Sequence, residues 1–146
     1  GNTDDHARNH AAFWDGKTLT LTPAYDICPQ NRTGREANQA MLISGETRAS
    51  TLAACIAAAP QFLLKESEAI ALAEAQIEGI RTHWPEVAEL AALSDVDKGT
   101  LWRRRLLNPY AFEGAPASIA AMRGAEPPPW TITTSVSGLM PLWSSA

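Results

Sequence analysis

The sequence contains little cysteine, no long apolar run and no surplus of positive charge. Its two cysteines, Cys28 and Cys55, are too few for a disulfide framework or for a four-cysteine zinc site. The richest apolar stretch, residues 52–64, is interrupted by Pro60 and Gln61, and it falls short of the roughly 18 residues that a membrane-spanning helix needs. The 12 Lys and Arg against 16 Asp and Glu give a formal net charge of −4, which argues against a general nucleic-acid binder.

The remaining composition is typical of a folded protein. Hydrophobic residues make up 45% of the 146 residues and charged residues 19%, which argues against wholesale disorder and predicts one domain of ordinary size. The chain opens with polar, motif-dense sequence, has no initial Met, and shows no basic region followed by an apolar one, as a signal peptide would. We therefore expect that it starts within something larger.

A β-hairpin is predicted near the amino-terminal end. Residues 10–14 are apolar and aromatic, and residues 18–22 alternate polar and apolar side chains with the period of two that a strand shows. Asp15-Gly16 between them is a strong hairpin signal, because a type I′ turn needs positive φ at both central residues. Pro23 then ends the second strand, since proline has no N–H to donate to a ladder.

The middle of the chain is predicted to be mostly helical. Residues 28–48 look irregular, with room for a short helix within 35–43, whereas residues 49–93 are dense in Ala, Leu and Glu, the better helix formers. The fold class that follows is mainly α with one small β-hairpin.

Capping residues and prolines divide this region into four predicted helices. In chain order we expect a helix capped by Ser50 or Thr51 and ending near Pro60, one capped by Ser67, one over 85–93 that opens with Pro85, and one capped by Ser94 or Asp95 that runs to about Leu107, before Asn108-Pro109. Within the second, an apolar stripe at 3-4-3-4 spacing is predicted to be core; it comprises Ile70, Ala73, Ile77, Ile80 and Trp84.

Residues 114–146 have a different composition from the rest. They contain five Pro, three Gly, five Ser and only two charged residues, Arg123 and Glu126. Residues 127–129 are three prolines, which favour polyproline II. We predict a folded unit over 1–113, followed by a Pro- and Ser-rich tail, or partner-covered segment, over 114–146.

The densest group of chemically useful side chains lies at residues 2–10, where two carboxylates and two imidazoles are close in sequence. Asp26 follows the predicted hairpin, and a tight hairpin returns the chain to nearly where it left. We therefore expect Asp4, Asn9 and Asp26 to lie together. Carboxylate and amide oxygens are hard ligands, suited to Mg²⁺ bridged to phosphate.

This layout resembles the catalytic half of a protein kinase, in which a D-x-x-x-x-N loop and a hairpin lead to a metal-binding Asp. Asp4, Asn9 and Asp26 have that order and spacing. The usual H-R-D and D-F-G are absent. Instead Asn-Thr-Asp-Asp-His-Ala-Arg-Asn and Leu-Thr-Pro-Ala-Tyr-Asp-Ile resemble the motifs of HipA-type kinases, the toxin half of bacterial HipA–HipB toxin–antitoxin pairs. The likeness is close over residues 1–30 and weaker to about residue 113.

The resemblance implies the C-terminal lobe of a protein-kinase-like fold and a Ser/Thr protein kinase that uses ATP and Mg²⁺. Asp4 would be the catalytic base that accepts the substrate hydroxyl proton. Asn9 and Asp26 would hold Mg²⁺ against the phosphates. His6 would lie near the phosphates, and Tyr25 would flank the nucleotide.

The resemblance also implies partners and a location. We expect a HipB-like, DNA-binding antitoxin, a protein substrate and the bacterial cytoplasm, with no membrane and no direct nucleic-acid contact. The sequence shows no glycine-rich loop, no strand lysine for the phosphates and no adenine hinge. In the family these belong to the amino-terminal lobe, so we expect the chain to be a carboxy-terminal fragment with little or no activity alone.

Two other readings stay open. The chain could be a non-catalytic, kinase-like binding module, or one half of a split kinase. It could also be a metal-dependent hydrolase that uses Asp4, His6, His10 and Asp26, although no Glu separates the two histidines as in H-E-x-x-H.

Overall fold

The computed structural model describes residues 2, 4–28, 30 and 36–124. It is mainly helical, with one two-stranded antiparallel sheet, as the composition and periodicity predicted. In chain order the elements are η1 (Ala7–Asn9), β1 (Ala12–Trp14), β2 (Leu19–Leu21), α1 (Leu52–Ala57), η2 (Ala59–Phe62), α2 (Glu66–Leu90), α3 (Asp95–Leu101), the π-helical turn η3 (Trp102–Leu106), η4 (Pro109–Phe112) and α4 (Ala117–Ala121). No helix in the described ranges is both long enough and apolar enough to cross a membrane.

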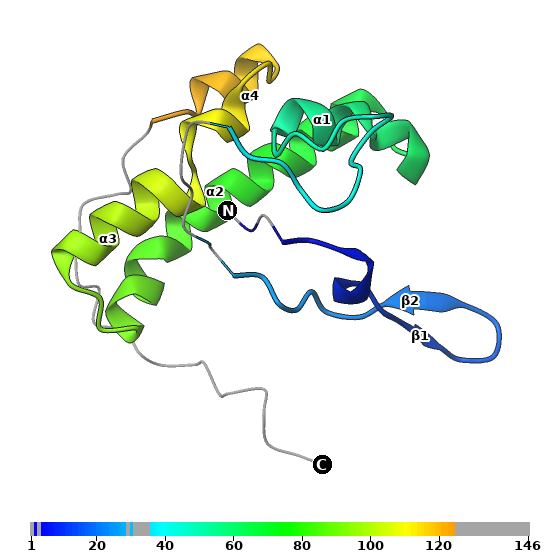
Figure 1. The fold of residues 1–146 in the computed structure, drawn as a ribbon, viewed down its shortest axis with the longest axis horizontal. Coiled ribbons are helices and arrows are strands. Elements are labelled where there is room, and N and C mark those ends of the chain that lie inside the picture. The colour runs from blue at the N-terminus through cyan, green and yellow to red at the C-terminus, as the bar shows by residue number, and fades with distance from the viewer. Residues whose placement is uncertain (1, 3, 29, 31–35, 125–146) are drawn as a thin grey trace.

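The long helix α2 organises the helical part of the molecule (Figure 1). Helices α1 and α4 pack along its amino-terminal half, and α3 lies beside its carboxy-terminal half. The β1–β2 hairpin projects away from these helices. The chain therefore separates into a helical body and an amino-terminal part of loops with one hairpin.

The hairpin forms where it was predicted, although its strands are shorter and its turn differs. Trp14 pairs with Leu19 and Ala12 with Leu21. Gly16 has φ +97°, but Asp15 does not adopt positive φ, so the turn is not a type I′ turn centred on Asp15-Gly16. Instead the Asp15 carboxylate accepts hydrogen bonds from the N–H groups of Lys17 (2.8 Å) and Thr18 (2.7 Å), which close the turn. Both bonds lower the pKa of Asp15 below its ordinary value of 3.8, and the bond from Thr18 has the larger effect.

Side-chain caps begin two of the helices as predicted. Thr51 accepts from Ala54 N–H at the start of α1 (3.2 Å), and Ser94 accepts from Asp97 N–H at the start of α3 (3.2 Å). The prediction that Ser67 caps the next helix is wrong. Instead, Lys65 is the residue before the first turn of α2. The Glu68 carboxylate reaches back and accepts the Lys65 N–H (2.7 Å), which caps the helix start.

The predicted break at Pro85 is also wrong, since α2 continues through this residue to Leu90. Proline inside a helix removes one backbone hydrogen bond and usually breaks or kinks the helix, at a cost of about 3 kcal/mol. Here Trp84 and Ala88, on either side of the proline, are both buried against Trp102. The packing of these side chains outweighs the local preference of the proline.

The core consists of two neighbouring apolar clusters. The larger surrounds Ile56, Ile77, Phe112 and Ile119, and the smaller joins the stacked rings of Trp84 and Trp102, whose centroids are 6.0 Å apart, with Ala88. The predicted stripe on α2 faces these clusters except at Ile80, which is 40% exposed and lies at the edge of the buried face. Burial of this apolar surface is the main source of stability for the helical body.

Two further expectations concern segments without long helices. Residues 36–43 do not form the short helix that was allowed within 35–43. Two isolated β-bridges lie within residues 38–49 instead, Asn38 with Ala49 and Ser44 with Thr47. The division of the chain at residue 113 stays a prediction. Within the segment that follows it, α4 packs on α2 and Ile119 is fully buried, while residues 125–146 lie outside the described part.

Candidate functional site

The two legs of the hairpin stay side by side below the strands. Beyond the Ala12–Leu21 pair, the backbone N–H of Thr22 donates to the carbonyl of Ala11 (3.0 Å). Nearer the helical body, the Tyr25 hydroxyl donates to the carbonyl of Arg8 (2.7 Å). The chain leaving η1 and the chain returning from β2 are thus joined along their length, which places residues 4–10 opposite residues 22–27.

The expected meeting of Asn9 and Asp26 occurs at the base of this arrangement. The Asn9 side-chain NH₂ donates to one carboxylate oxygen of Asp26 (2.7 Å), and the side-chain oxygen of Asn9 accepts from the His6 backbone N–H (3.1 Å). Asn9 is 8% exposed, whereas Asp26 is exposed. A carboxylate and an amide therefore share one spot, with the second oxygen of Asp26 open to a ligand.

The backbone of Asp26 is unusual. Its φ is +57°, in the left-handed region that most L-residues avoid and that Asp and Asn tolerate better than others. Such a conformation persists where the surrounding contacts hold it, and it is common at functional sites. Here it accompanies the turn that presents the Asp26 carboxylate to Asn9.

Asp4 forms no described hydrogen bond with Asn9 or Asp26. Its side chain is exposed, and its N–H donates to the side-chain oxygen of Asn2 (3.2 Å). In the described part of the chain, no hydrogen bond joins the Asp4 carboxylate to Asn9 or Asp26. The structure therefore brings together two of the three predicted oxygen donors and leaves the third on the adjoining loop.

The other predicted site residues lie nearby with partners of their own. Tyr25 is 43% exposed and bonds to Arg8 as described above. The buried Nδ1 of His6 has no hydrogen-bonding partner among the described residues. The ring of His10 contacts Asp5 instead, at 3.0 Å, and no group of three or more His, Cys, Asp or Glu in the described ranges is placed to hold a metal ion. Among the described residues, the alternative of a metal-dependent hydrolase that uses Asp4, His6, His10 and Asp26 therefore finds no support.

A pocket of about 360 Å³ adjoins this region. Polar side chains from three segments line it together with an apolar wall; they include Asn2, Asp5, Asn9, His10, Tyr25 and Gln39, while Leu21 and Ile27 belong to the wall. Convergent polar groups with an apolar side are typical of small-ligand sites. Gln39, in a stretch that the sequence predicts to be irregular, is one of the polar lining residues and contacts the backbone of Asn2 and Asp5.

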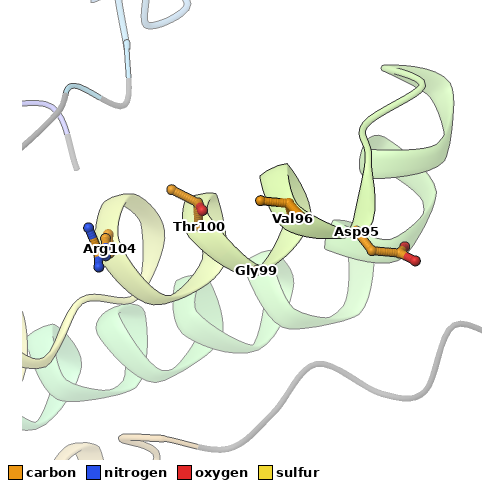
Figure 2. Close-up of a pocket in the computed structure, with 5 residues that line it drawn as sticks. All are labelled: Asp95, Val96, Gly99, Thr100 and Arg104. Carbon is orange, nitrogen blue, oxygen red and sulfur yellow. The ribbon is translucent and has the colours of Figure 1, made fainter.

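A larger hollow, of about 500 Å³, lies along α3 and η3. Figure 2 shows its lining along α3 and η3, with Asp95 and Arg104 at opposite ends. These two charged groups do not converge on one point, and Val96 and Gly99 between them bring no chemistry. Size alone therefore does not make this hollow the better candidate, and we take the smaller pocket as the candidate site. Asn9 and Tyr25 line that pocket, whereas Asp4, His6 and Asp26 do not.

Comparison with known families gives one match. The family model of the HipA-like C-terminal domain matches residues 1–84, more than half of the chain. The chain belongs to this HipA family. No curated protein and no solved structure gave a significant match.

The matched region contains everything described at the site. It covers the loop at residues 4–10, the hairpin, Asp26, the segment with Gln39 and most of α2. The resemblance noted from two short motifs is thus confirmed as membership of the HipA family, over a longer stretch than those motifs. Helices α3 and α4 lie beyond the matched residues.

Proposed function

We propose that this HipA-family chain supplies the catalytic and metal-binding half of a Ser/Thr protein kinase, which transfers a phosphoryl group from Mg-ATP to a protein hydroxyl. The observation that carries the proposal is the Asn9–Asp26 contact of 2.7 Å at the base of the hairpin, beside a pocket, in a chain with the D-x-x-x-x-N spacing from Asp4 to Asn9. Phosphoryl transfer depends mostly on such positioning and on charge stabilisation.

The donor set fits a magnesium ion. Asp26 keeps one carboxylate oxygen free of described partners. The side-chain oxygen of Asn9 accepts one hydrogen bond from the His6 N–H and has a second lone pair. The Asn9 NH₂, which faces Asp26, cannot bind a cation, so Asn9 would share an ion with Asp26 only through that oxygen. Magnesium usually takes one or two protein ligands and completes its shell with water and phosphate oxygens. Bound Mg-ATP would supply the transferable phosphoryl group and the neutralising charge.

The roles proposed for the other residues are those that the resemblance to the family implies. Asp4, on an exposed loop, would accept the proton of the substrate hydroxyl. Tyr25, which lines the pocket, would flank the nucleotide, and His6 would lie near the phosphates. A HipB-like antitoxin and a protein substrate, in a bacterial cytoplasm, are the partners that the family suggests.

The phosphate-binding lysine of a complete kinase would come from another lobe. Lys17 lies in the hairpin turn, Lys65 precedes α2, and Lys98 pairs with Glu89 between α2 and α3 (2.5 Å). None of these three lines the pocket beside Asn9. We therefore expect the chain alone to bind Mg-ATP weakly and to transfer phosphoryl groups slowly, so transfer is followed with radiolabelled ATP over long incubations.

Calorimetric titration with Mg-ATP, followed by a phosphoryl-transfer assay with casein as the hydroxyl donor, tests the proposal. Asp26→Asn keeps a residue that tolerates positive φ but removes the charge, and should weaken Mg-ATP binding by about 10- to 100-fold. Asp4→Asn should leave binding unchanged and lower transfer by about 10²- to 10⁴-fold.

The matched control is Asp95→Asn, whose side chain is 96% exposed on α3. It should change neither quantity. Binding that is equally strong in wild type, Asp26→Asn and Asp95→Asn would contradict the proposed metal site, and full transfer by Asp4→Asn would contradict the proposed base.

A further inference from the structure

The segment after the hairpin folds back into a small turn of its own. The N–H of Gln39 donates to the carbonyl of Arg48 (2.7 Å), and the Arg48 guanidinium donates to the carbonyl of Ala40 (2.7 Å). Further along, the N–H of Ile43 donates to the carbonyl of Thr47 (2.9 Å). This turn leads directly to Thr51, the cap of α1, and so connects to the helical body.

The side chain of Gln39 reaches from this turn to the loop that carries Asp4. Its NH₂ donates to the carbonyl of Asn2 (2.7 Å), and its carbonyl oxygen accepts from the N–H of Asp5 (3.4 Å). The N–H of Met41 donates to the carbonyl of Asp5 (3.3 Å). Gln39 thus contacts the backbone on both sides of Asp4, while the Asp4 side chain stays exposed.

From this geometry we infer that Gln39 is a positioning residue, which fixes the backbone on both sides of Asp4 and so sets where the Asp4 carboxylate lies. The catalytic consequence rests on the proposed function, whereas the contact between the two segments does not. The amide of Gln39 suits the task because one group both donates and accepts. The glutamine bridges the turn at 38–49 and the loop at 2–5, so the position of Asp4 depends on the helical body through α1.

The expected consequence is large for one neutral side chain. A reacting group displaced by about 1 Å can cost about 100-fold in rate, because the bound geometry must approach the reactive one. Gln39 does not contact Asn9 or Asp26 through any described hydrogen bond. Its loss should therefore lower the rate of transfer without a comparable change in Mg-ATP binding.

The test uses the full chain with Gln39→Ala, Gln39→Glu and the control Gln76→Ala, an exposed glutamine on α2. In Gln39→Ala the Asp5 and Met41 amide protons should exchange about 3- to 10-fold faster. The Asp5 N–H loses its acceptor on Gln39, and the Met41 N–H donates to the carbonyl of the same Asp5. Transfer to casein should fall about 10- to 100-fold, with a smaller change in the Mg-ATP dissociation constant, because Gln39 lines the pocket but does not bond to Asn9 or Asp26. Gln39→Glu keeps the acceptor but, when ionised, loses the donor. Its exchange and transfer rates should therefore lie between those of wild type and Gln39→Ala.

The outcomes separate this inference from the proposed function. If Gln39→Ala leaves the exchange of both amide protons at the wild-type and Gln76→Ala rates, the positioning inference is overturned, whatever the activity. Wild-type transfer by Gln39→Ala beside loss of transfer in Asp4→Asn also overturns it. If instead exchange quickens as expected but wild type and Asp4→Asn transfer equally, the positioning of the loop stands and the proposed function fails.

Discussion

The amino-terminal part of the chain and its helical body are held together by different forces. The body buries Ile77, Trp84 and Ile119 in two apolar clusters, and its helices α1 and α3 begin with side-chain caps. In the amino-terminal part every residue of β1 and β2 is exposed, including Trp14 and Leu21. There, polar contacts such as the Asn9–Asp26 bond hold the segments in place.

This difference separates the packed core, which supplies most of the stability, from the candidate site. A two-stranded hairpin with no buried face is only marginally stable in water, so the site depends on a small number of directional bonds. Segments with few buried apolar contacts also open locally more often than a packed core. We expect the helical body to determine global unfolding and the polar bonds to determine the shape of the site, and the following changes test that division.

The largest effect should follow from a cavity in the body. Ile119 is fully buried against α2, so Ile119→Ala removes apolar burial and leaves a cavity. The free energy of unfolding should fall by about 2–5 kcal/mol, measured by urea denaturation followed by circular dichroism. Leu90→Ala, at a side chain that is 80% exposed, is the control and should change it by less than about 0.5 kcal/mol. Similar effects for both would mean that α4 does not belong to the core.

A smaller and more local effect should follow from Asn9→Ala. This change removes the donor to Asp26 and the acceptor for the His6 N–H, at a cost of about 1–3 kcal/mol to the local structure. Amide protons of residues 4–28 should exchange faster, while those of α2 keep the wild-type rate, as hydrogen-exchange NMR would show. Equal acceleration in both regions would contradict the independence of the two parts.

The Thr51 cap of α1 should contribute about as much to the free energy of unfolding as a typical helix cap does. Thr51→Ala removes the acceptor for the Ala54 N–H, and should lower the free energy of unfolding by about 1 kcal/mol. Thr51→Ser keeps the acceptor and serves as the matched control in the same denaturation experiment. A Thr51→Ala protein as stable as Thr51→Ser would show that α1 does not depend on this bond.

The smallest effect concerns pH and the hairpin turn. Hydrogen bonds to the Asp15 carboxylate lower its pKa below 3.8, so its contribution to the turn is fully present above that value and is lost as the pH falls through the folded-state pKa. The Thr18 amide resonance should therefore move only below about pH 4, where the carboxylate becomes protonated. In Asp15→Asn this movement should vanish, and its persistence would assign the transition to another group.

Local signals in the sequence predicted a good part of this structure. Asp15-Gly16 marked the hairpin, although the carboxylate of Asp15 sets the turn rather than positive φ at that residue. Thr51 and Ser94 marked helix starts because a cap needs only neighbouring residues. The motif spacing, with the hairpin between, correctly brought Asn9 to Asp26.

The sequence failed where distant residues decide the structure. Pro85 reads locally as a helix start, but the burial of Trp84 and Ala88 against Trp102 keeps α2 continuous. Gln39 is 34 residues from its partner Asp5 in the sequence, and no local sequence pattern predicts that contact. A glutamine in an irregular stretch carries no signal, so only the folded chain reveals its place beside Asp4.

The central claim is that Asn9 and Asp26 bind one divalent cation. The most direct measurement is NMR line broadening by Mn²⁺, a paramagnetic substitute for Mg²⁺, added to the chain with ATP. The account predicts that the Asn9 side-chain NH₂ and the Asp26 amide broaden first, that Mg²⁺ competes for the site, and that Asp26→Asn abolishes the effect. Broadening that begins at Asp95 and Asp97 on α3, or that persists unchanged in Asp26→Asn, would contradict it.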